Sequence, residues 1–420
     1  MIDNLFICYV PGLDRRRIDP GDTPHVAGLL ERYGEASLEP LPTTELVPSL
    51  VTGTYPHDHR VWQVQLKPDL KTTALDRVLD AVPDSLMKLW QCGRHVFDPG
   101  MDLVCLPRRR RRKFISYRFK YTRRVKQSQS TMAQFNGMPS IFKLLGDETR
   151  YYFDKSFDKA EARLDQLVDP SQRMMFYEFY AFDMFCHWQM DQPERVISQL
   201  QRTDRLIAEL HRLCDERDVT FMLLVDHGQE PVRGHVDFLR ALRETGVPRS
   251  EYETYSEIGV ARLWFHTDRA RKVITQKMHE LEHVQVRTWE EMHQYNIRFE
   301  DASFGELYLY CDHGYTFYPH DFAQPLGSFY QSFKSPEMRG RRFNPRHRGN
   351  HGHLPDHPSE KGYVVLADDR WSVAHADADV IDFAPSVLRL LGETPPATMK
   401  GTPIYRAAAE ADALPLRKAV

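Results

Sequence analysis

The stretch T-T-E-L-V-P-S-L-V-T-G-T-Y-P-H-D-H, residues 43–59, carries the pattern that decides the fold. Two hydroxyl residues, Thr43 and Thr44, open a short apolar run, which predicts a helix ending at Gly53. A hydroxyl at a helix N-terminus lies among free backbone N–H groups and at the positive end of the helix dipole. An anion such as a phosphate is stabilised in that place, and a nucleophilic hydroxyl would be held against it.

The composition is that of a globular protein able to bury a large core. Of the 420 residues, 27% are charged and 41% are hydrophobic. The net charge of −3 argues against a nucleic-acid partner, and no apolar run approaches the ~20 residues that span a bilayer, so we expect no membrane partner. The N-terminus has an acid where a secretion signal needs a base. Six scattered cysteines without a C-x-x-C pair fit a reducing, cytoplasmic location.

Strand and helix patterns alternate along the chain. Continuous apolar runs predict buried strands, and apolar residues at helical spacing predict amphipathic helices. The expected strands are 5–10, 220–225, 259–265, 284–287, 305–311 and 362–367, and the expected helices include 192–216, 268–281 and 384–391. This alternation predicts an α/β protein with a largely parallel central sheet flanked by helices.

A strongly basic segment interrupts this alternation. Between Arg108 and Lys126 there are eleven basic residues. The segment is interpreted either as a solvated insertion or as a basic lid that attracts an anionic substrate, with a nucleic-acid or membrane patch as a third reading. We expect one domain, 1–420, with an inserted basic cap at 96–175.

Three separate motifs supply the carboxylates and imidazoles that divalent metals prefer. F-Y-A-F-D-M-F-C-H-W-Q places an Asp and a His four residues apart on one side of a helical turn. L-L-V-D-H-G ends a buried strand, where α/β sheets bind ligands, and G-N-H-G-H is a glycine-flanked loop. The candidate ligands are Asp183, His187, Asp226, His227, His351 and His353.

A second D-H-G motif competes with the first. C-D-H-G repeats the pattern after another strand, so Asp312 and His313 are alternatives to Asp226 and His227 by spacing alone. The run before Asp226 is more uniformly apolar, which favours the first motif.

The order of these motifs resembles the alkaline phosphatase superfamily, most closely its type I phosphodiesterase/nucleotide pyrophosphatase branch. Residues 43–59 are similar to the family pattern T-x-P-N-x-x-x-(L/I)-V-T-G-x-Y-P-x-x-H-G. D-M-F-C-H resembles D-x-x-G-H, V-D-H-G-Q resembles S-D-H-G-M, and G-N-H-G-H resembles G-x-H-G-Y. D-F-A-P-S-V-L-R-L-L-G, residues 382–392, resembles a terminal family motif. The resemblance implies an alkaline phosphatase-like sandwich.

The resemblance also implies a chemistry. A threonine nucleophile, Thr43 or its neighbour Thr44, would attack a small anionic phosphate ester, with hydrolysis of a phosphodiester or pyrophosphate bond. The implied cofactors are two divalent ions, zinc foremost and manganese as an alternative, that clamp the attacking and leaving oxygens. One ion would be held by Asp183, His187 and His351. The other would be held by Asp226, His227, the threonine oxygen and an N-terminal aspartate.

The sequence departs from the family pattern in ways that keep two alternatives open. Pro11 stands where the family has its N-terminal metal aspartate, and Asp14 is the substitute that could reach back. Leu46 stands where a phosphate-contacting asparagine is expected, and Arg60 where a glycine is expected. The alternatives are a degenerate member that acts as a binding or scaffold protein, and a phosphomonoesterase or phosphotransferase of the same superfamily.

Overall fold

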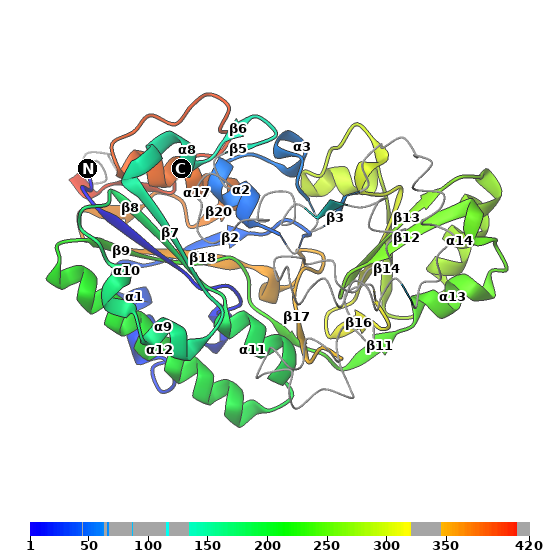
Figure 1. Ribbon diagram of the computed structural model, residues 1–420, viewed down its shortest axis with the longest axis horizontal. Coiled ribbons are helices and arrows are strands. Elements are labelled where there is room, and N and C mark those ends of the chain that lie inside the picture. Colours follow the sequence, from blue (N-terminus) through cyan, green and yellow to red (C-terminus); the bar gives the residue numbers. More distant parts are fainter. Residues whose placement is uncertain are drawn as a thin grey trace, which may run out of the picture.

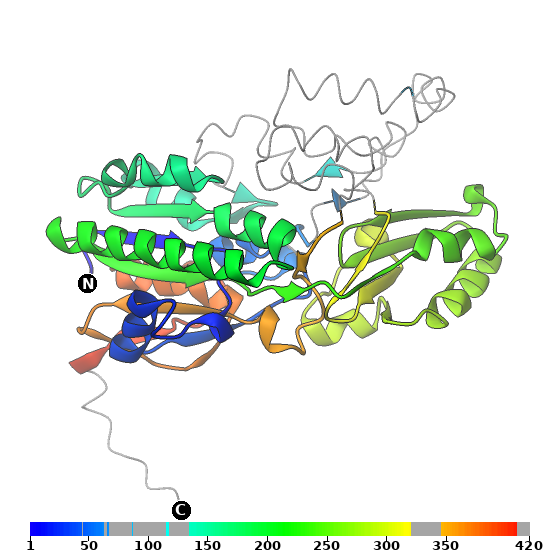
Figure 2. The ribbon, with the colours of Figure 1, turned by 90° about the horizontal axis from the view of Figure 1, so that it is seen from below.

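The protein consists of a large α/β unit and a smaller unit beside it (Figures 1 and 2). The computed structural model describes residues 1–43, 45–62, 134–320 and 346–409, with short pieces at 65–66, 86 and 115–116. Over these described residues, no helix is both long and apolar enough to cross a membrane. The predicted basic segment 108–126 lies outside them, apart from 115–116, and so does Thr44.

The large unit is built on a seven-stranded sheet in which every neighbouring pair is parallel except those made by β18. Its strands, in order across the sheet, are β20 (Asp377–Asp379), β2 (Ala36–Glu39), β18 (Gly362–Ala367), β9 (Thr220–Val225), β1 (Leu5–Tyr9), β8 (Met174–Phe179) and β7 (Thr149–Asp154). The predicted largely parallel central sheet is therefore confirmed. Since β1, β2, β8 and β9 all run the same way, the segments that follow them meet at one edge of the sheet.

Helices cover both faces of this sheet (Figure 1). Alternate residues of β1 show why the run 5–10 is continuously apolar: Leu5 and Ile7 point into one core, and Phe6 and Cys8 into the other. The core with Leu5 is covered by α2 (Val47–Thr52), α8 (Ile141–Leu145) and α17 (Phe383–Leu390). The core with Phe6 is covered by α1 (Pro24–Tyr33), α9 (Phe157–Glu161), α10 (Leu164–Leu167), α11 (Ala181–Gln189) and α12 (Pro193–Glu216).

Gly53 ends helix α2 in the left-handed conformation, with φ 60°. An added Cβ there would lie 3.1 Å from Pro385 Cδ and 3.2 Å from the Ile381 carbonyl oxygen. Two independent reasons therefore favour glycine in the V-T-G motif: its left-handed backbone and the close approach of the D-F-A-P motif. Two motifs more than 300 residues apart in the sequence thus form one packed unit.

The small unit is a four-stranded antiparallel sheet covered by two helices (Figure 1). Its elements are α13 (Phe238–Glu244), β12 (Tyr252–Ser256), β13 (Val260–Phe265), α14 (Asp268–His279), β14 (Val284–Thr288) and β15 (Leu307–Cys311). The strands and the helix predicted over 259–311 are thus present, but they form a sheet of their own rather than part of the central one.

Only part of the predicted insertion 96–175 is described, and most of that part belongs to the large unit. It includes α8 and β7, and β7 pairs in parallel with β8 at the edge of the large sheet. Residues 141–175 therefore belong to the large unit and not to a cap. The sequence alone could not show this, because β7 is an edge strand that is buried only at its two ends and so lacks a continuous apolar run.

Candidate functional site

Asp183 and His187 lie on helix α11, which begins directly after β8 at the carboxyl edge of the sheet. Both side chains are buried, and Asp183 Oδ2 is 3.4 Å from His187 Nε2. His187 Nδ1 donates to the Gly349 carbonyl at 3.0 Å. That bond fixes the proton on Nδ1, so Nε2 presents a lone pair on the side of Asp183.

Asp226 and His227 follow β9 at the same edge and are also buried. His227 Nδ1 donates to the Gly228 carbonyl at 2.9 Å, so its Nε2 is likewise free to bind a cation. Asp226 Oδ2 lies 3.3 Å from that Nε2 and accepts a hydrogen bond of 2.5 Å from the Tyr9 hydroxyl on β1.

His351 completes a compact group of three possible metal ligands. Ligand atoms of Asp183, His227 and His351 all lie within 4.8 Å of one another. His351 Nε2 is 3.7 Å from Asp183 Oδ1, and the His227 and His351 rings stack with centroids 3.6 Å apart. The family resemblance assigns His227 to a different ion from Asp183 and His351, but the structure brings these three residues together. His187 is outside the group of three, although it contacts Asp183.

The electrostatics of the group suit a cation. Burial raises the pKa of Asp183, but the contact with His187 and the nearness of His351 and His227 outweigh it and hold this pKa well below its usual range. Burial and the neighbouring His227 lower the pKa of His351, so its imidazole is neutral. Asp183 Oδ2, Asp226 Oδ1 and His351 Nδ1 are buried without a hydrogen-bond partner among the described residues. Unpaired buried lone pairs are costly unless a cation satisfies them, so these residues fit a divalent metal.

Gln229 is a positioning residue that the sequence did not single out. Its Nε2 donates to Asp183 Oδ1 and, at 3.1 Å, to the Asp183 carbonyl. The Gln229 amide therefore fixes the orientation of the Asp183 carboxylate, as residues hydrogen-bonded to metal ligands commonly do. The only signal in the sequence is its place directly after the D-H-G motif.

The turn after β1 packs directly against the metal-ligand group. Gly12 has φ 75°, and an added Cβ would lie 3.1 Å from Asp183 Oδ1. Pro11–Gly12 therefore occupies the place next to Asp183 that the family pattern gives to an aspartate. Asp14 lies behind Gly228, and both of its carboxylate oxygens accept from the Arg16 guanidinium, at 3.0 and 2.6 Å.

We expect Gly12→Ala to weaken metal binding about tenfold or more, because its methyl group would displace the Asp183 carboxylate. The left-handed backbone alone would cost about 1–2 kcal/mol of stability. Gly246→Ala is the matched control, since Gly246 has φ 65° and nothing within 4 Å of the added Cβ. Isothermal titration with zinc should separate the two variants. Equal affinities would contradict the close packing of Gly12 on Asp183.

We expect Tyr9→Phe to lower the free energy of unfolding by about 1.5–3 kcal/mol, because it removes a buried hydrogen bond to a carboxylate. Tyr363→Phe is the control: its hydroxyl is buried in the same sheet without a hydrogen-bond partner among the described residues. Removing that hydroxyl should be nearly neutral. Urea denaturation of the metal-free proteins measures both effects, and equal losses would show that the bond to Asp226 contributes nothing.

Thr43 lies beyond β2, at the same edge of the sheet as the metal-ligand group. Its hydroxyl donates to the Trp62 carbonyl and accepts from the Glu45 backbone N–H at 3.0 Å. The predicted start of the helix is wrong: α2 begins at Val47, so Thr43 stands in the turn before it. Pro48 is consistent with this start, since proline is favoured in the first turn of a helix.

The small unit holds the turn that carries Thr43. Tyr310 Oη and Trp62 Nε1 both donate to the Pro42 carbonyl, at 2.9 and 3.0 Å. Trp62 is fully buried in the aromatic core of the small unit, with Tyr308 at a ring distance of 4.9 Å. The position of the candidate nucleophile is therefore set by contacts that come from both units.

The other sequence departures also have a structural setting. Arg60 adopts φ 60°, the conformation that favours the expected glycine, and its guanidinium binds Asp301 of the small unit at 2.6 Å. Leu46 is buried in the large core beside α2. The competing D-H-G motif does not join the metal-ligand group: His313 lies with His353 and Glu360 instead.

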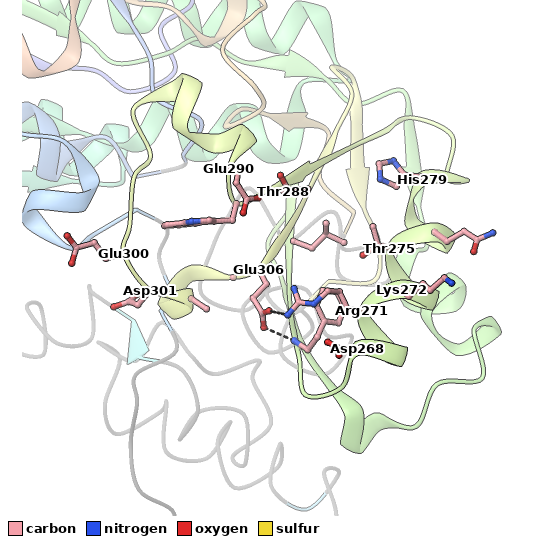
Figure 3. Close-up of a pocket in the computed structure, with 16 residues that line it drawn as sticks. Asp268, Arg271, Lys272, Thr275, His279, Thr288, Glu290, Glu300, Asp301 and Glu306 are labelled. Carbon is pink, nitrogen blue, oxygen red and sulfur yellow. Dashed lines mark hydrogen bonds and ion pairs between the residues drawn. The ribbon is translucent and has the colours of Figure 1, made fainter.

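A separate hollow of about 700 Å³ lies in the small unit, between α14 and the segment 300–307 (Figure 3). Its lining combines charged residues with apolar ones such as Phe265 and Trp289, and Arg271 and Glu306 within it form an ion pair. The lining includes no member of the Asp183 group, so the hollow is not the place where that group would act.

Comparisons with solved structures bear on the fold. Murine ectonucleotide pyrophosphatase/phosphodiesterase 5, in an inactive variant bound to AMP, has a TM-score of 0.60 at 13% identity, covering 96% of this chain and 98% of that chain. The same murine protein in another structure has a TM-score of 0.60 at 14% identity, covering 95% and 97%. The human protein has a TM-score of 0.57 at 13% identity, covering 93% and 95%. These similarities show a shared fold.

No curated protein sequence matches this chain. The family model for type I phosphodiesterase/nucleotide pyrophosphatase matches residues 10–374. That match spans both units and every member of the metal-ligand group, so this chain belongs to the type I phosphodiesterase/nucleotide pyrophosphatase family.

Proposed function

We propose that this protein is a metal-dependent phosphoesterase that hydrolyses a phosphodiester or pyrophosphate bond. The observation that carries the proposal is the buried group of Asp183, His227 and His351 at the carboxyl edge of the sheet. A divalent ion bound there supplies a Lewis acid for a phosphoryl oxygen. The protein contributes imidazole nitrogens, a carboxylate held ionised, and a fixed geometry.

Thr43 is the proposed nucleophile. Its proton is directed to the Trp62 carbonyl, so attack on phosphorus requires that this proton pass to water as the new P–O bond forms, while the P–O bond to the leaving alcohol or phosphate breaks. Support comes from the relative: the murine protein described as inactive carries an alanine in place of a threonine and still binds AMP. The resulting phospho-threonine would then be hydrolysed by water, which returns the hydroxyl.

A second ion is a further part of the proposal. Asp226 is a candidate ligand with one buried oxygen unpaired among the described residues. Asp14 would complete the set only after its carboxylate left Arg16, which holds it through two hydrogen bonds. We therefore propose a first site that binds zinc tightly, because its donors are nitrogen and oxygen, and a second site that binds more weakly.

The proposed substrate is a small anionic phosphate ester, by analogy with the AMP complex of the relative. The proposed location is the reducing cytoplasm, supported by the free and buried state of the cysteines in the described part of the chain, Cys8, Cys186, Cys214 and Cys311.

Metal analysis combined with a substrate panel tests the proposal. The panel contains nitrophenyl phosphate monoesters, bis-nitrophenyl phosphate and a dinucleotide pyrophosphate, assayed with zinc or manganese after chelation. We expect at least one bound ion per chain and turnover of a diester or pyrophosphate. Turnover of monoesters alone would favour the phosphomonoesterase alternative. A chain that binds no metal and cleaves none of the panel would refute the proposal, and would favour the binding or scaffold alternative that Pro11 already suggests.

A further inference from the structure

A second group of possible metal ligands lies where the small unit meets the large one. His313 follows β15 of the small unit, and His353 and Glu360 lie in the segment 351–361 that leads into β18 of the large sheet. Ligand atoms of these three residues all lie within 4.8 Å of one another. None of the three belongs to the group of Asp183, His227 and His351.

Glu360 is the anionic centre of this second group. It is 3% exposed, its Oε2 accepts from the Gly352 backbone N–H at 2.8 Å, and its Oε1 accepts from His353 Nδ1 at 2.8 Å. A buried carboxylate needs compensating charge as well as hydrogen bonds. A divalent cation bound to Oε1 would provide that charge.

The orientation of the His313 ring also favours a bound cation. Its Nε2 donates to Asp356 Oδ1 at 3.3 Å, which places the ring proton on Nε2 and leaves Nδ1 as a bare lone pair. That Nδ1 is buried without a hydrogen-bond partner among the described residues, and it lies 3.9 Å from Glu360 Oε1. A lone pair facing a carboxylate is unfavourable unless a cation lies between them. A carboxylate on the far nitrogen is also the usual support of a metal-binding histidine.

We propose that His313, His353 and Glu360 bind a zinc ion that joins the two units. Two imidazoles and a carboxylate are zinc ligands, and a fourth position would be left for water. Zinc bonds of about 2.0–2.2 Å place neighbouring ligand atoms about 3.3 Å apart. The three ligand atoms here lie within 4.8 Å of one another, so shifts of about 1.5 Å or less would bring them to that spacing. The His353 proton moves from Nδ1 to Nε2, and the Asn350 amide, now 3.3 Å from Nε2, turns to present its oxygen.

The consequence is structural. The ion would fix the loop 312–314 of the small unit to the segment 351–361, which also carries His351. Zinc at this second site would therefore stabilise the arrangement of the units and would not depend on whether the first site is catalytic.

Zinc stoichiometry of the full chain tests the proposal, with binding measured on protein stripped by a chelator and then reloaded. His313→Gln should bind one equivalent less than the unaltered protein, and Asp183→Asn should also lose one equivalent, but from the other site. The double variant should lose both. His279→Gln, an exposed histidine on α14, is the control and should keep the full stoichiometry. Asp356→Asn should weaken binding at this site about 10–100-fold.

If His313→Gln fails to fold, a cobalt-substituted His313→Cys variant provides a second test of the site. A thiolate at this position should still bind cobalt and should give a thiolate-to-cobalt charge-transfer band that the unaltered protein lacks. Full stoichiometry in His313→Gln, or cobalt binding to the cysteine variant without that band, would overturn the proposed site. Either result would leave the phosphoesterase proposal untouched, because neither measures turnover.

Discussion

Asp183→Asn is expected to lower phosphoesterase turnover by at least about 1,000-fold and to abolish zinc binding at the Asp183 group. Asp183 is the shared member of this group, in contact with both His187 and His351. An amide keeps the shape of the side chain but removes the charge that binds the cation. Several kcal/mol of transition-state stabilisation by the metal are lost with it, and each 1.4 kcal/mol corresponds to about tenfold in rate.

The measurement combines steady-state kinetics on the best diester with metal analysis of the same sample. Asp204→Asn is the matched control, because Asp204 is a buried aspartate of α12 that accepts from the backbone N–H groups of His25 and Val26, at 3.2 and 2.8 Å. This control should lose stability but keep its zinc and its turnover per folded molecule. An Asp183→Asn variant that retained both zinc and turnover would exclude the proposed metal site.

Thr43→Ala is expected to lower turnover by at least about 1,000-fold while zinc at the Asp183 group stays unchanged. The nucleophilic oxygen is removed, whereas the Asp183 group keeps all its ligands. Thr43→Ser should retain part of the activity, because the serine hydroxyl can make the same bonds to Trp62 and Glu45. Quenching the reaction with acid and analysing the protein by mass spectrometry should reveal a phosphate on residue 43 only when a hydroxyl is present.

Thr52→Ala controls for the structural part of this effect. Thr52 is buried in α2 and donates to the Pro48 carbonyl at 2.6 Å, so its loss also removes a buried hydroxyl-to-carbonyl bond. We expect each alanine variant to lose about 1 kcal/mol of stability from that bond, but only Thr43→Ala to lose turnover. Thr44→Ala decides between the adjacent hydroxyls. Turnover that survives in both Thr43→Ala and Thr44→Ala would refute covalent catalysis by this segment.

The sequence alone determined the central elements of the fold and the family. The runs 220–225 and 362–367 coincide with β9 and β18, because strands buried on both faces must be continuously apolar. The helix predicted over 192–216 is α12, one residue shorter, because its apolar face follows the helical period. The motif order predicted the family that the model match then showed.

Tertiary structure alone decided which ligands meet and which of two similar motifs lies among them. The more uniformly apolar run before Asp226 favours Asp226–His227 over Asp312–His313, but each pair follows a buried strand, so local pattern does not show which pair meets Asp183. The first strand pairs with β1 and ends beside Asp183, whereas the second belongs to a separate antiparallel sheet and ends beside Glu360. Strand pairing is a long-range property that local pattern does not encode, and it decides which side chains share one edge.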